Sequence, residues 1–274
     1  MSGAGPRAGV CGWPVDHSLS PLMMSAWLKA ARLPGSYDKL PVAAHEFEAR
    51  VRGLAAEGYA GLNVTIPHKE QALALADEAS AAAIAVGAAN LLVFRGGRVL
   101  AGNTDIDGLD AALAGDDGTG PAVLIGAGGA ARAALWRLSR QDRDIRIVNR
   151  TIVRARALAE AFGLDVDIYD KPAATVLKDA RLIINATSMG MSGQPQLEAA
   201  LEAVAPDALV FDMVYTPLET GLLRQAKALG LRTSDGLAML IGQARPSFEA
   251  FFGAPPPDDD SVRALLEAAL EARA

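Results

Sequence analysis

Several expected strands of this chain end in clusters of hydrogen-bonding side chains, which are the residue types that bind and transform small polar molecules. In the segment 61–69, Asn63 and Thr65 occupy alternate positions of a strand end, and Lys69 follows at the start of a helix. Asn90 closes the segment 87–90, where a turn residue is the alternative interpretation, and Asp105 closes the segment 102–105. Asp105 offers a carboxylate that can pair with the Lys69 ammonium. We therefore expect a site with amide and hydroxyl groups, one cation and its counter-charge.

Two serines precede a proline in the segment 17–21, which predicts a second polar cluster at the beginning of a helix. Ser20 is a suitable N-cap and Pro21 a suitable first helical residue. The hydroxyls of Ser18 and Ser20 would then lie at the positive end of the helix dipole, where a substrate carboxylate binds favourably. The alternative is that these serines only cap the helix.

A glycine-rich segment in mid-chain indicates a dinucleotide site. Residues 126–131 follow the apolar run 122–125 and precede a helical pattern at 132–138. Gly126 permits a tight turn, Gly128 lets the backbone approach phosphates, and Ala131 keeps the helix close to the strand. The predicted pyrophosphate-binding residues are Gly126, Ala127, Gly128, Gly129 and Ala130. A glycine turn without a ligand is the alternative.

The next expected strand, 145–148, indicates which dinucleotide is bound. It ends in Asn149, Arg150 and Thr151, about twenty residues after the glycines, where an acidic residue would hold the ribose 2'-hydroxyl of NAD. No acid stands there, and Arg150 and Arg154 can hold a 2'-phosphate because guanidinium offers paired donors to phosphate oxygens. The sequence therefore predicts NADP, unless the arginines are only solvated residues at a helix start.

Composition excludes several other classes of function. The formal net charge of −6 argues against sequence-independent binding of nucleic acid. The single cysteine, Cys11, excludes an intrachain disulfide, and the three scattered histidines predict no metal site. These features favour a reducing cytoplasm. No stretch approaches the roughly twenty apolar residues that span a bilayer, so a membrane partner is not expected.

Short apolar segments alternate with Ala- and Leu-rich helical patterns, which predicts an α/β fold with a mainly parallel sheet. Strands are expected near 8–11, 36–40, 61–64, 91–94, 122–125, 145–148, 166, 182–185 and 209–213. We expect a first domain at 1–105, completed by the helical tail 237–274, and a Rossmann-like NADP-binding domain at 106–236. The tail is split at 253–257 and has Asp258–Asp260 at its second helix start. A cleft between the two domains is the expected ligand site.

The chain resembles the shikimate dehydrogenase family over essentially its whole length. The resemblance lies in the segments 12–21, 63–69, 87–90, 102–105, 126–130, 149–151, 185–187 and 236–243. It implies an NADP-dependent oxidoreductase that interconverts shikimate and 3-dehydroshikimate in aromatic amino-acid biosynthesis. It also implies an N-terminal substrate domain, a Rossmann-like domain facing it, and a protein that acts as a monomer or homodimer.

The resemblance implies roles for individual residues. Ser18, Ser20 and Tyr215 would bind the substrate carboxylate, and the ring hydroxyls would be surrounded by Asn63, Thr65, Asn90 and Gln243. Lys69 and Asp105 would transfer the proton. Met213 and Gly236 would belong to the cofactor site. The chain departs from the family pattern at Met24 and Ser25, where relatives commonly carry His and Asn, and at Leu91, where Thr is common.

Two alternatives stay open at this point. One is a quinate or dual-specificity relative of the same fold, and the other is an NADP-binding module without catalysis. The serine pair and Arg150 favour shikimate with NADP, while the presence of both Lys69 and Asp105 favours an enzyme.

Overall fold

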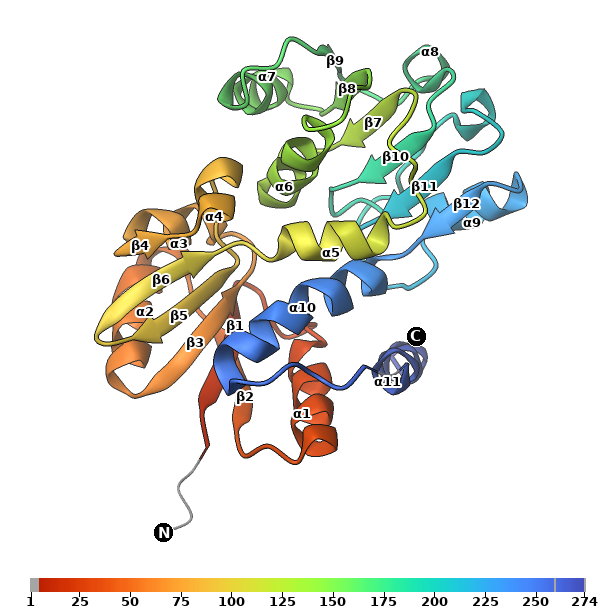
Figure 1. Cartoon of the computed structure of the whole chain (residues 1–274). Helices are drawn as coiled ribbons and strands as arrows, with labels where there is room; N and C mark the ends of the chain where they lie inside the picture. The colour runs from red at the N-terminus through yellow and green to blue at the C-terminus, as the bar shows by residue number, and fades with distance from the viewer. Residues whose placement is uncertain (1–4, 259, 274) are drawn as a thin grey trace. The chain divides into compact units, whose positions relative to one another are not determined.

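The computed structural model describes residues 5–258 and 260–273, and the chain divides into two compact units (Figure 1). Unit 1 runs to Asp107 and includes Gln243–Ala269, whereas unit 2 comprises Gly108–Gly242 and the chain from Leu270 onward. Each unit has its own sheet flanked by helices, so the expected α/β class is confirmed. Asp259, one of the aspartates expected at the start of the last helix, lies outside the described residues.

Unit 1 contains a mixed six-stranded sheet in the order β2-β1-β3-β5-β6-β4. The strands are β1 (Arg7–Gly12), β2 (Ser36–Pro41), β3 (Tyr59–Val64), β4 (Glu78–Ala79), β5 (Leu91–Arg95) and β6 (Arg98–Gly102). β5 runs antiparallel to both β3 and β6, whereas the other three strand pairings are parallel, so the sheet is mainly parallel with one antiparallel strand. The β5–β6 hairpin turns at Gly96 and Gly97, whose φ angles of 57° and 75° suit a tight two-residue turn.

The helices of unit 1 come from both ends of the chain. They are α1 (Ser20–Ala31), α2 (Phe47–Ala56), α3 (Lys69–Leu75), α4 (Ala81–Val86), the start of α5 (Asp105–Ala112), most of α10 (Gly236–Phe252) and most of α11 (Ser261–Glu271), with a short 3-10 turn η1 (Ala44–Glu46). Trp27 of α1 packs edge to face on Phe248 of α10, with ring centroids 5.7 Å apart and both side chains buried. This contact fixes the tail helix on the N-terminal part of the unit.

Unit 2 contains a parallel six-stranded sheet in the order β12-β11-β10-β7-β8-β9. The strands are β7 (Ala122–Ile125), β8 (Ile145–Val148), β9 (Asp167–Tyr169), β10 (Leu182–Asn185), β11 (Leu209–Asp212) and β12 (Arg232–Ser234). The covering elements are α6 (Gly129–Leu138), α7 (Ile152–Ala161), α8 (Ala174–Leu177), η2 (Leu201–Ala203) and α9 (Gly221–Ala228). This is the strand order of a doubly wound dinucleotide-binding fold, whose ligand site lies where the order reverses, between β7 and β10.

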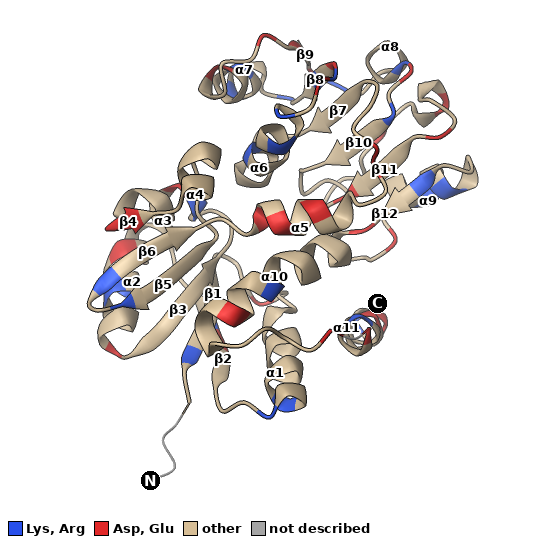
Figure 2. Cartoon of the chain, viewed as in Figure 1, with Lys and Arg blue, Asp and Glu red and all other residues tan. Residues whose placement is uncertain are grey.

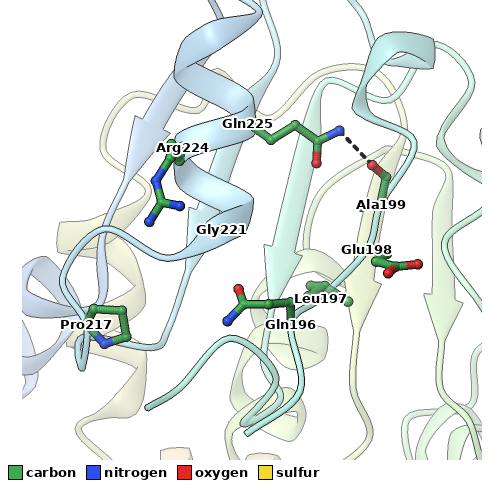
Figure 3. Close-up of a pocket in the computed structure, with 8 residues that line it drawn as sticks. All are labelled: Gln196, Leu197, Glu198, Ala199, Pro217, Gly221, Arg224 and Gln225. Carbon is green, nitrogen blue, oxygen red and sulfur yellow. Dashed lines mark hydrogen bonds between the residues drawn. The ribbon is translucent and has the colours of Figure 1, made fainter. Parts of the chain in front are cut away.

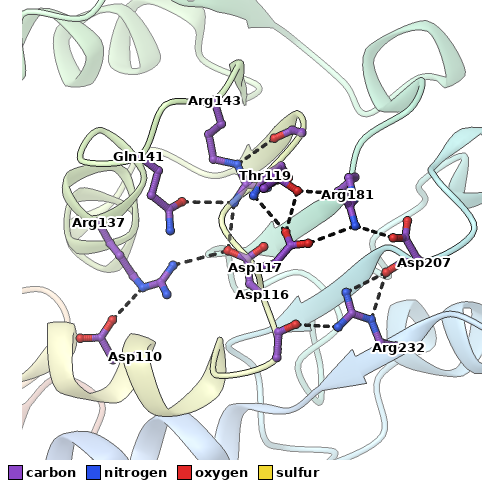
Figure 4. A network of polar contacts seen from close by, with 12 residues as sticks. Asp110, Asp116, Asp117, Thr119, Arg137, Gln141, Arg143, Arg181, Asp207 and Arg232 are labelled. Atoms are coloured by element: carbon purple, nitrogen blue, oxygen red, sulfur yellow. Dashed lines mark hydrogen bonds and ion pairs between the residues drawn. The ribbon is translucent and has the colours of Figure 1, made fainter.

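A network of arginines and aspartates anchors the loop that leads into β7 (Figure 4). The Arg143 guanidinium lies 2.9 Å from the Asp116 carboxylate, and both side chains are buried. Arg143 also donates to the carbonyl oxygens of Thr119 and Gly120. Because an unpaired buried charge is costly, the network holds this loop in one conformation. It lies at the amino end of β7, and the glycine-rich segment follows the opposite end.

Charged residues of both signs are interspersed over the helices and loops (Figure 2). Across the described part of the chain, no helix combines the length and apolar character that a membrane span requires.

Candidate active site

Strand register in unit 1 brings the predicted polar residues to one edge of the sheet. Asn63, near the end of β3, pairs with Leu91 at the start of β5, and Leu91 pairs in turn with Gly102 at the end of β6. Asn90 directly precedes β5, and Asp105 follows β6 after two residues. The two antiparallel pairings therefore align three chain segments that are far apart in the sequence.

Lys69 and Asp105 form an ion pair in which Lys69 Nζ donates to Asp105 Oδ2 over 2.6 Å. The Asp105 side chain is 1% exposed and that of Lys69 is 13% exposed. Asp105 is the first residue of α5, where the helix dipole favours a carboxylate. The arrangement presents an ammonium group with two further N–H donors at the edge of a buried carboxylate.

Asn90 connects the ion pair to the rest of the cluster. Its Nδ2 lies 2.9 Å from Asp105 Oδ1, 3.1 Å from Thr104 Oγ1 and 3.0 Å from Gln243 Oε1. Its Oδ1 accepts the backbone N–H of Thr104 over 2.7 Å. The Asn90 amide is thus fully committed inside the protein, and it fixes the second carboxylate oxygen of Asp105.

Asn63 is also held from several sides. Its Oδ1 accepts the Tyr37 hydroxyl over 2.7 Å, and its Nδ2 donates to Ser247 Oγ over 2.8 Å and to the Asn90 carbonyl over 3.3 Å. Burial raises the pKa of Tyr37 well above its usual value, so the phenol stays a neutral donor. Sequence reasoning missed Tyr37 and Ser247. Ser247 follows Gln243 by four residues on α10, a spacing that places both on one helix face.

Thr65 lies beside this cluster, just beyond β3. Its backbone N–H donates to the Cys11 carbonyl over 2.9 Å, which joins the segment after β3 to the end of β1. The Thr65 side chain is partly exposed, so its hydroxyl can face a ligand. Burial raises the pKa of the Cys11 thiol to about 12, so Cys11 has no nucleophilic role at neutral pH.

The serine pair is arranged differently from the capping prediction. α1 begins at Ser20 itself, with Leu19 at the N-cap, and no side chain caps the helix. The prediction that Ser20 is the N-cap was wrong because the fully buried Leu19 occupies that position. Ser18 Oγ accepts the Ser20 backbone N–H over 3.3 Å, and both serines are largely buried.

The glycine-rich segment of unit 2 has the geometry that a pyrophosphate requires. Gly126 has a φ of 122°, and a Cβ there would lie 3.0 Å from the Ala186 carbonyl oxygen, so only glycine fits. Gly128 caps α6 without a side-chain hydrogen bond, and a Cβ built on it meets nothing within 4 Å. Gly128 therefore adjoins open space at the start of α6, and these residues fit the diphosphate of a dinucleotide.

The segment after β8 is preorganised for a second anionic contact. Asn149 Nδ2 donates to the Thr151 carbonyl over 2.8 Å and so shapes the turn before α7. Arg150 and Arg154 are exposed, and within residues 5–258 and 260–273 neither forms an ion pair. Their guanidinium groups are thus available to an external phosphate, unlike that of the buried Arg143.

A buried network stabilises the strand ends next to the glycine-rich segment. Asp212 accepts hydrogen bonds from Asn185 Nδ2 over 2.9 Å, from the Val214 N–H over 3.0 Å and from the Thr220 hydroxyl over 2.7 Å. Asn185 Oδ1 in turn accepts both donors of Thr187, whose methyl group lies close to Gly126. The network was not predicted, and it fixes the chain on both sides of the expected nucleotide site.

Three predicted residues lie after β11 in unit 2. The Met213 backbone N–H donates to the Asn185 carbonyl over 3.0 Å. A Cβ on Gly236 would lie 2.4 Å from the Met213 carbonyl oxygen, so these two predicted cofactor residues are neighbours. Tyr215, predicted at the substrate carboxylate, belongs to the same unit, and its role stays a prediction.

A separate pocket of about 450 Å³ lies in unit 2 (Figure 3). It is lined by Gln196, Leu197, Glu198, Ala199, Pro217, Gly221, Arg224 and Gln225. Gln225 Nε2 donates to the Ala199 carbonyl over 3.0 Å, so the wall is held by a structural bond. None of these eight lining residues belongs to the predicted site. Among the described residues, no group of His, Cys, Asp or Glu is arranged to hold a metal ion.

Models of protein families match both halves of the chain. Residues 10–92 match the model described as "Shikimate dehydrogenase substrate binding domain", and residues 115–213 match "Shikimate / quinate 5-dehydrogenase". The first match contains Lys69 and the second contains the glycine-rich segment.

Individual relatives match over nearly the full length. The protein of Paracoccus denitrificans named shikimate dehydrogenase (NADP(+)) is 47% identical over 270 residues, which cover 95% of this chain and 96% of that protein. The structure of shikimate 5-dehydrogenase from Thermus thermophilus in complex with NADP(H) and shikimate superposes with a TM-score of 0.84 at 36% identity, covering 97% of this chain and 99% of the other. Quinate dehydrogenase from Corynebacterium glutamicum in complex with NAD has a TM-score of 0.83 at 29% identity and covers 97% and 99%.

Proposed function

The chain belongs to the shikimate dehydrogenase family, and we propose that it catalyses the reversible NADP-dependent interconversion of shikimate and 3-dehydroshikimate in aromatic amino-acid biosynthesis. The observation that carries this conclusion is the near-full-length identity to relatives named NADP-dependent shikimate dehydrogenases, together with the buried Lys69–Asp105 pair. The relative in complex with NADP(H) and shikimate supports the same pair of ligands.

The cofactor is held by unit 2 in this proposal. The residues that would hold the diphosphate are those at the start of α6: Gly126, Ala127, Gly128, Gly129 and Ala130. Arg150 and Arg154 hold the 2'-phosphate, with Asn149 and Thr151 shaping their turn. Met213 and Gly236 line the site further along.

The substrate is held by residues of unit 1, joined by Tyr215. Ser18, Ser20 and Tyr215 bind the carboxylate, while Asn63, Thr65, Asn90 and Gln243 surround the ring hydroxyls. The Gln243 Oε1 atom accepts from Asn90, which orients its Nε2 donors toward a ligand. A ligand that leaves such buried polar groups without partners is bound more weakly, and this is the basis of discrimination.

Proton transfer is the task of Lys69. When bound, NADPH would supply the hydride that the carbonyl carbon of 3-dehydroshikimate takes up. The Lys69 ammonium donates a proton to the carbonyl oxygen, so the C=O double bond becomes a CH–OH group and the lysine becomes neutral. Asp105 holds Nζ in position and balances its charge, and Asn90 fixes Asp105. In the reverse direction neutral Lys69 accepts the hydroxyl proton. The partly exposed Lys69 side chain exchanges protons with water between turnovers.

Substrate binding and cofactor binding are assigned to different units. We propose that residues 1–105 with 237–274 form the substrate domain and that 106–236 bind NADP. The unit boundaries next to Asp107 and Gln243 support this proposal. We also propose a cytoplasmic enzyme that acts as a monomer or homodimer on a small molecule, without nucleic acid or membrane as partner. The NADP-linked biosynthetic reaction and the single buried thiol support that setting.

One assay tests the proposal. The purified protein is incubated with shikimate or quinate, each with NADP or NAD, and initial rates give kcat/KM for the four pairs. Shikimate with NADP is expected to give the highest value. A higher value for quinate with NAD would favour the activity of the Corynebacterium relative. No turnover of either substrate would favour a module that binds the nucleotide without catalysis.

A further inference from the structure

The hydroxyl group of Ser247 contacts Asn63 and Gln243, two residues of the proposed substrate site, and Thr104 beside them. Asn63 Nδ2 donates to Ser247 Oγ over 2.8 Å, and Thr104 Oγ1 lies 3.4 Å from it. Ser247 Oγ donates to the Gln243 carbonyl oxygen over 3.1 Å. Ser247 is 0% exposed, so water does not replace these bonds.

The Ser247 hydroxyl helps to fix the orientation of the Asn63 amide, with Nδ2 toward Ser247 and Oδ1 toward Tyr37. An amide side chain has two N–H donors and one carbonyl acceptor. Both Asn63 donors are directed inward, one to Ser247 Oγ and the other to the Asn90 carbonyl. On the other side, the Tyr37 hydroxyl donates to Asn63 Oδ1. The Asn90 carbonyl can only accept and the Ser247 hydrogen points to the Gln243 carbonyl, so a flipped amide would place the Asn63 oxygen against acceptors.

The same hydroxyl is connected to the catalytic pair. Thr104 lies between Ser247 and Asn90, since Asn90 Oδ1 accepts the Thr104 N–H and Asn90 Nδ2 contacts Thr104 Oγ1. Asn90 Nδ2 also donates to Asp105 Oδ1. One continuous series of hydrogen bonds therefore leads from Tyr37, through Ser247, to the carboxylate that holds Lys69.

We propose that Ser247 is a positioning residue for substrate specificity, which holds the Asn63 amide in the orientation that reads a ring hydroxyl of shikimate. The inference rests on the proposed function, because it assigns a task to residues of that same site. Ser247 is not a catalytic residue, since it acts on the substrate only through Asn63. The competing explanation is a serine that only satisfies its own helix carbonyl.

Steady-state kinetics of Ser247→Ala in the full-length enzyme distinguish the two explanations. Loss of one buried hydrogen-bond partner is expected to raise the KM for shikimate by about five- to tenfold. The KM for NADP should stay unchanged, and kcat should fall less than about threefold, because the lost interaction acts on binding in ground and transition states alike. Ser139→Ala is the matched control. Its hydroxyl donates only to the Trp136 carbonyl of its own helix, and all constants should stay at wild-type values.

The KM for substrate analogues distinguishes a loss of substrate recognition from a general loss of protein stability. Shikimate analogues that lack one of the two hydroxyls not oxidised in the reaction are assayed with wild type and Ser247→Ala. For the hydroxyl that the Asn63 network reads, the KM difference between the two enzymes should disappear. An equal KM difference for every analogue would overturn the proposal.

Two further variants keep the test decisive if Ser247→Ala folds poorly. Ser247→Cys keeps a side chain of similar shape but replaces the hydroxyl with a weak partner, and Tyr37→Phe removes the donor on the other side of Asn63. Both should raise the KM for shikimate, and the double variant Tyr37→Phe/Ser247→Ala should lose less than the product of the single effects. If all three single variants have the same KM for shikimate as the wild-type enzyme, the inference about Ser247 is overturned but the proposed function is not. An inactive wild-type enzyme overturns the proposed function and the inference together.

Discussion

Lys69 and Asp105 contact each other as the first residues of two different helices, with Lys69 Nζ 2.6 Å from Asp105 Oδ2. Asp105 precedes seven residues of α5 and lies at the end of its dipole that favours an anion. The start of α3 gives the Lys69 ammonium no such support, and Asp105 supplies its counter-charge. The two side chains therefore act as one unit, and the predictions for catalysis treat them together.

Cofactor choice is tested at Arg150. Arg150→Ala should weaken NADP binding by about 1.5 to 3 kcal/mol, because a charge-assisted contact to the 2'-phosphate is lost. NAD binding should hardly change, since NAD has no phosphate at that position. The measurement is titration of each nucleotide, with Arg156→Ala, at an exposed arginine within α7, as the control. Equal weakening of both nucleotides by Arg150→Ala would disprove the assignment.

The substrate carboxylate is tested at the serine pair. Ser18→Ala with Ser20→Ala should raise the KM for shikimate by about tenfold or more while the KM for NADP stays constant. Since no side chain caps α1, the melting temperature should change little. Kinetics and thermal unfolding of the same preparation check both statements. A lower melting temperature with an unchanged KM would show that the serines are structural.

Asp212 gives a prediction for stability against pH. Burial raises the pKa of Asp212 above its usual 3.8, although hydrogen bonds from Thr220, Val214 and Asn185 oppose this effect. A carboxyl group with a raised pKa binds its proton more tightly in the folded state. Its contribution to stability is therefore full below the usual pKa and is lost as the pH rises through the raised value.

Asp212→Asn removes this titration. The free energy of unfolding of wild type, relative to that of the variant, should fall as the pH rises from about 4 toward neutrality. Urea unfolding of both proteins over this pH range measures the difference. A difference that does not vary with pH would show that burial does not shift Asp212. The side-chain amide can still accept from Asn185 and Val214 through its oxygen, so the variant is expected to fold.

The sequence predicted the parts of the fold that depend on local pattern. The apolar runs of β7, β10 and β11 and the glycines before α6 identify the nucleotide-binding half correctly. β6 was missed because its apolar run covers only residues 99–101, between Arg98 and Gly102. That strand nevertheless positions Asp105, since its antiparallel pairing with β5 brings the segment after Gly102 beside Asn90.

Contacts between distant segments were beyond sequence reasoning. Asn63 and Ser247 are 184 residues apart, and Asn63 and Tyr37 are 26 residues apart, so only the folded chain shows that they meet. Local capping rules also failed at Ser20, where burial of Leu19 decides the first helical residue. The motif residues Lys69, Asn90 and Asp105 were named from their types and positions at strand ends, and the structure places them in mutual contact.

Coupling between the catalytic residues is tested by a double-mutant cycle. Asp105→Asn should lower kcat, because the amide holds the lysine less firmly and does not balance its charge. Lys69→Ala/Asp105→Asn should lose much less than the product of the two single effects, since either change alone disables the pair. Turnover numbers at saturating shikimate and NADP are compared for the four proteins. Strictly multiplicative losses would show that the two residues act independently.

The most direct test of the account is the turnover number of Lys69→Ala, measured together with NADP titration of the same preparation. The account predicts that kcat falls by about a hundredfold or more, the scale for loss of a positioned acid or base, while NADP binds as in wild type. Retained NADP binding would show that unit 2 is folded and that the loss lies in proton transfer. A Lys69→Ala enzyme with near-normal kcat would contradict the assignment of Lys69 as the proton donor.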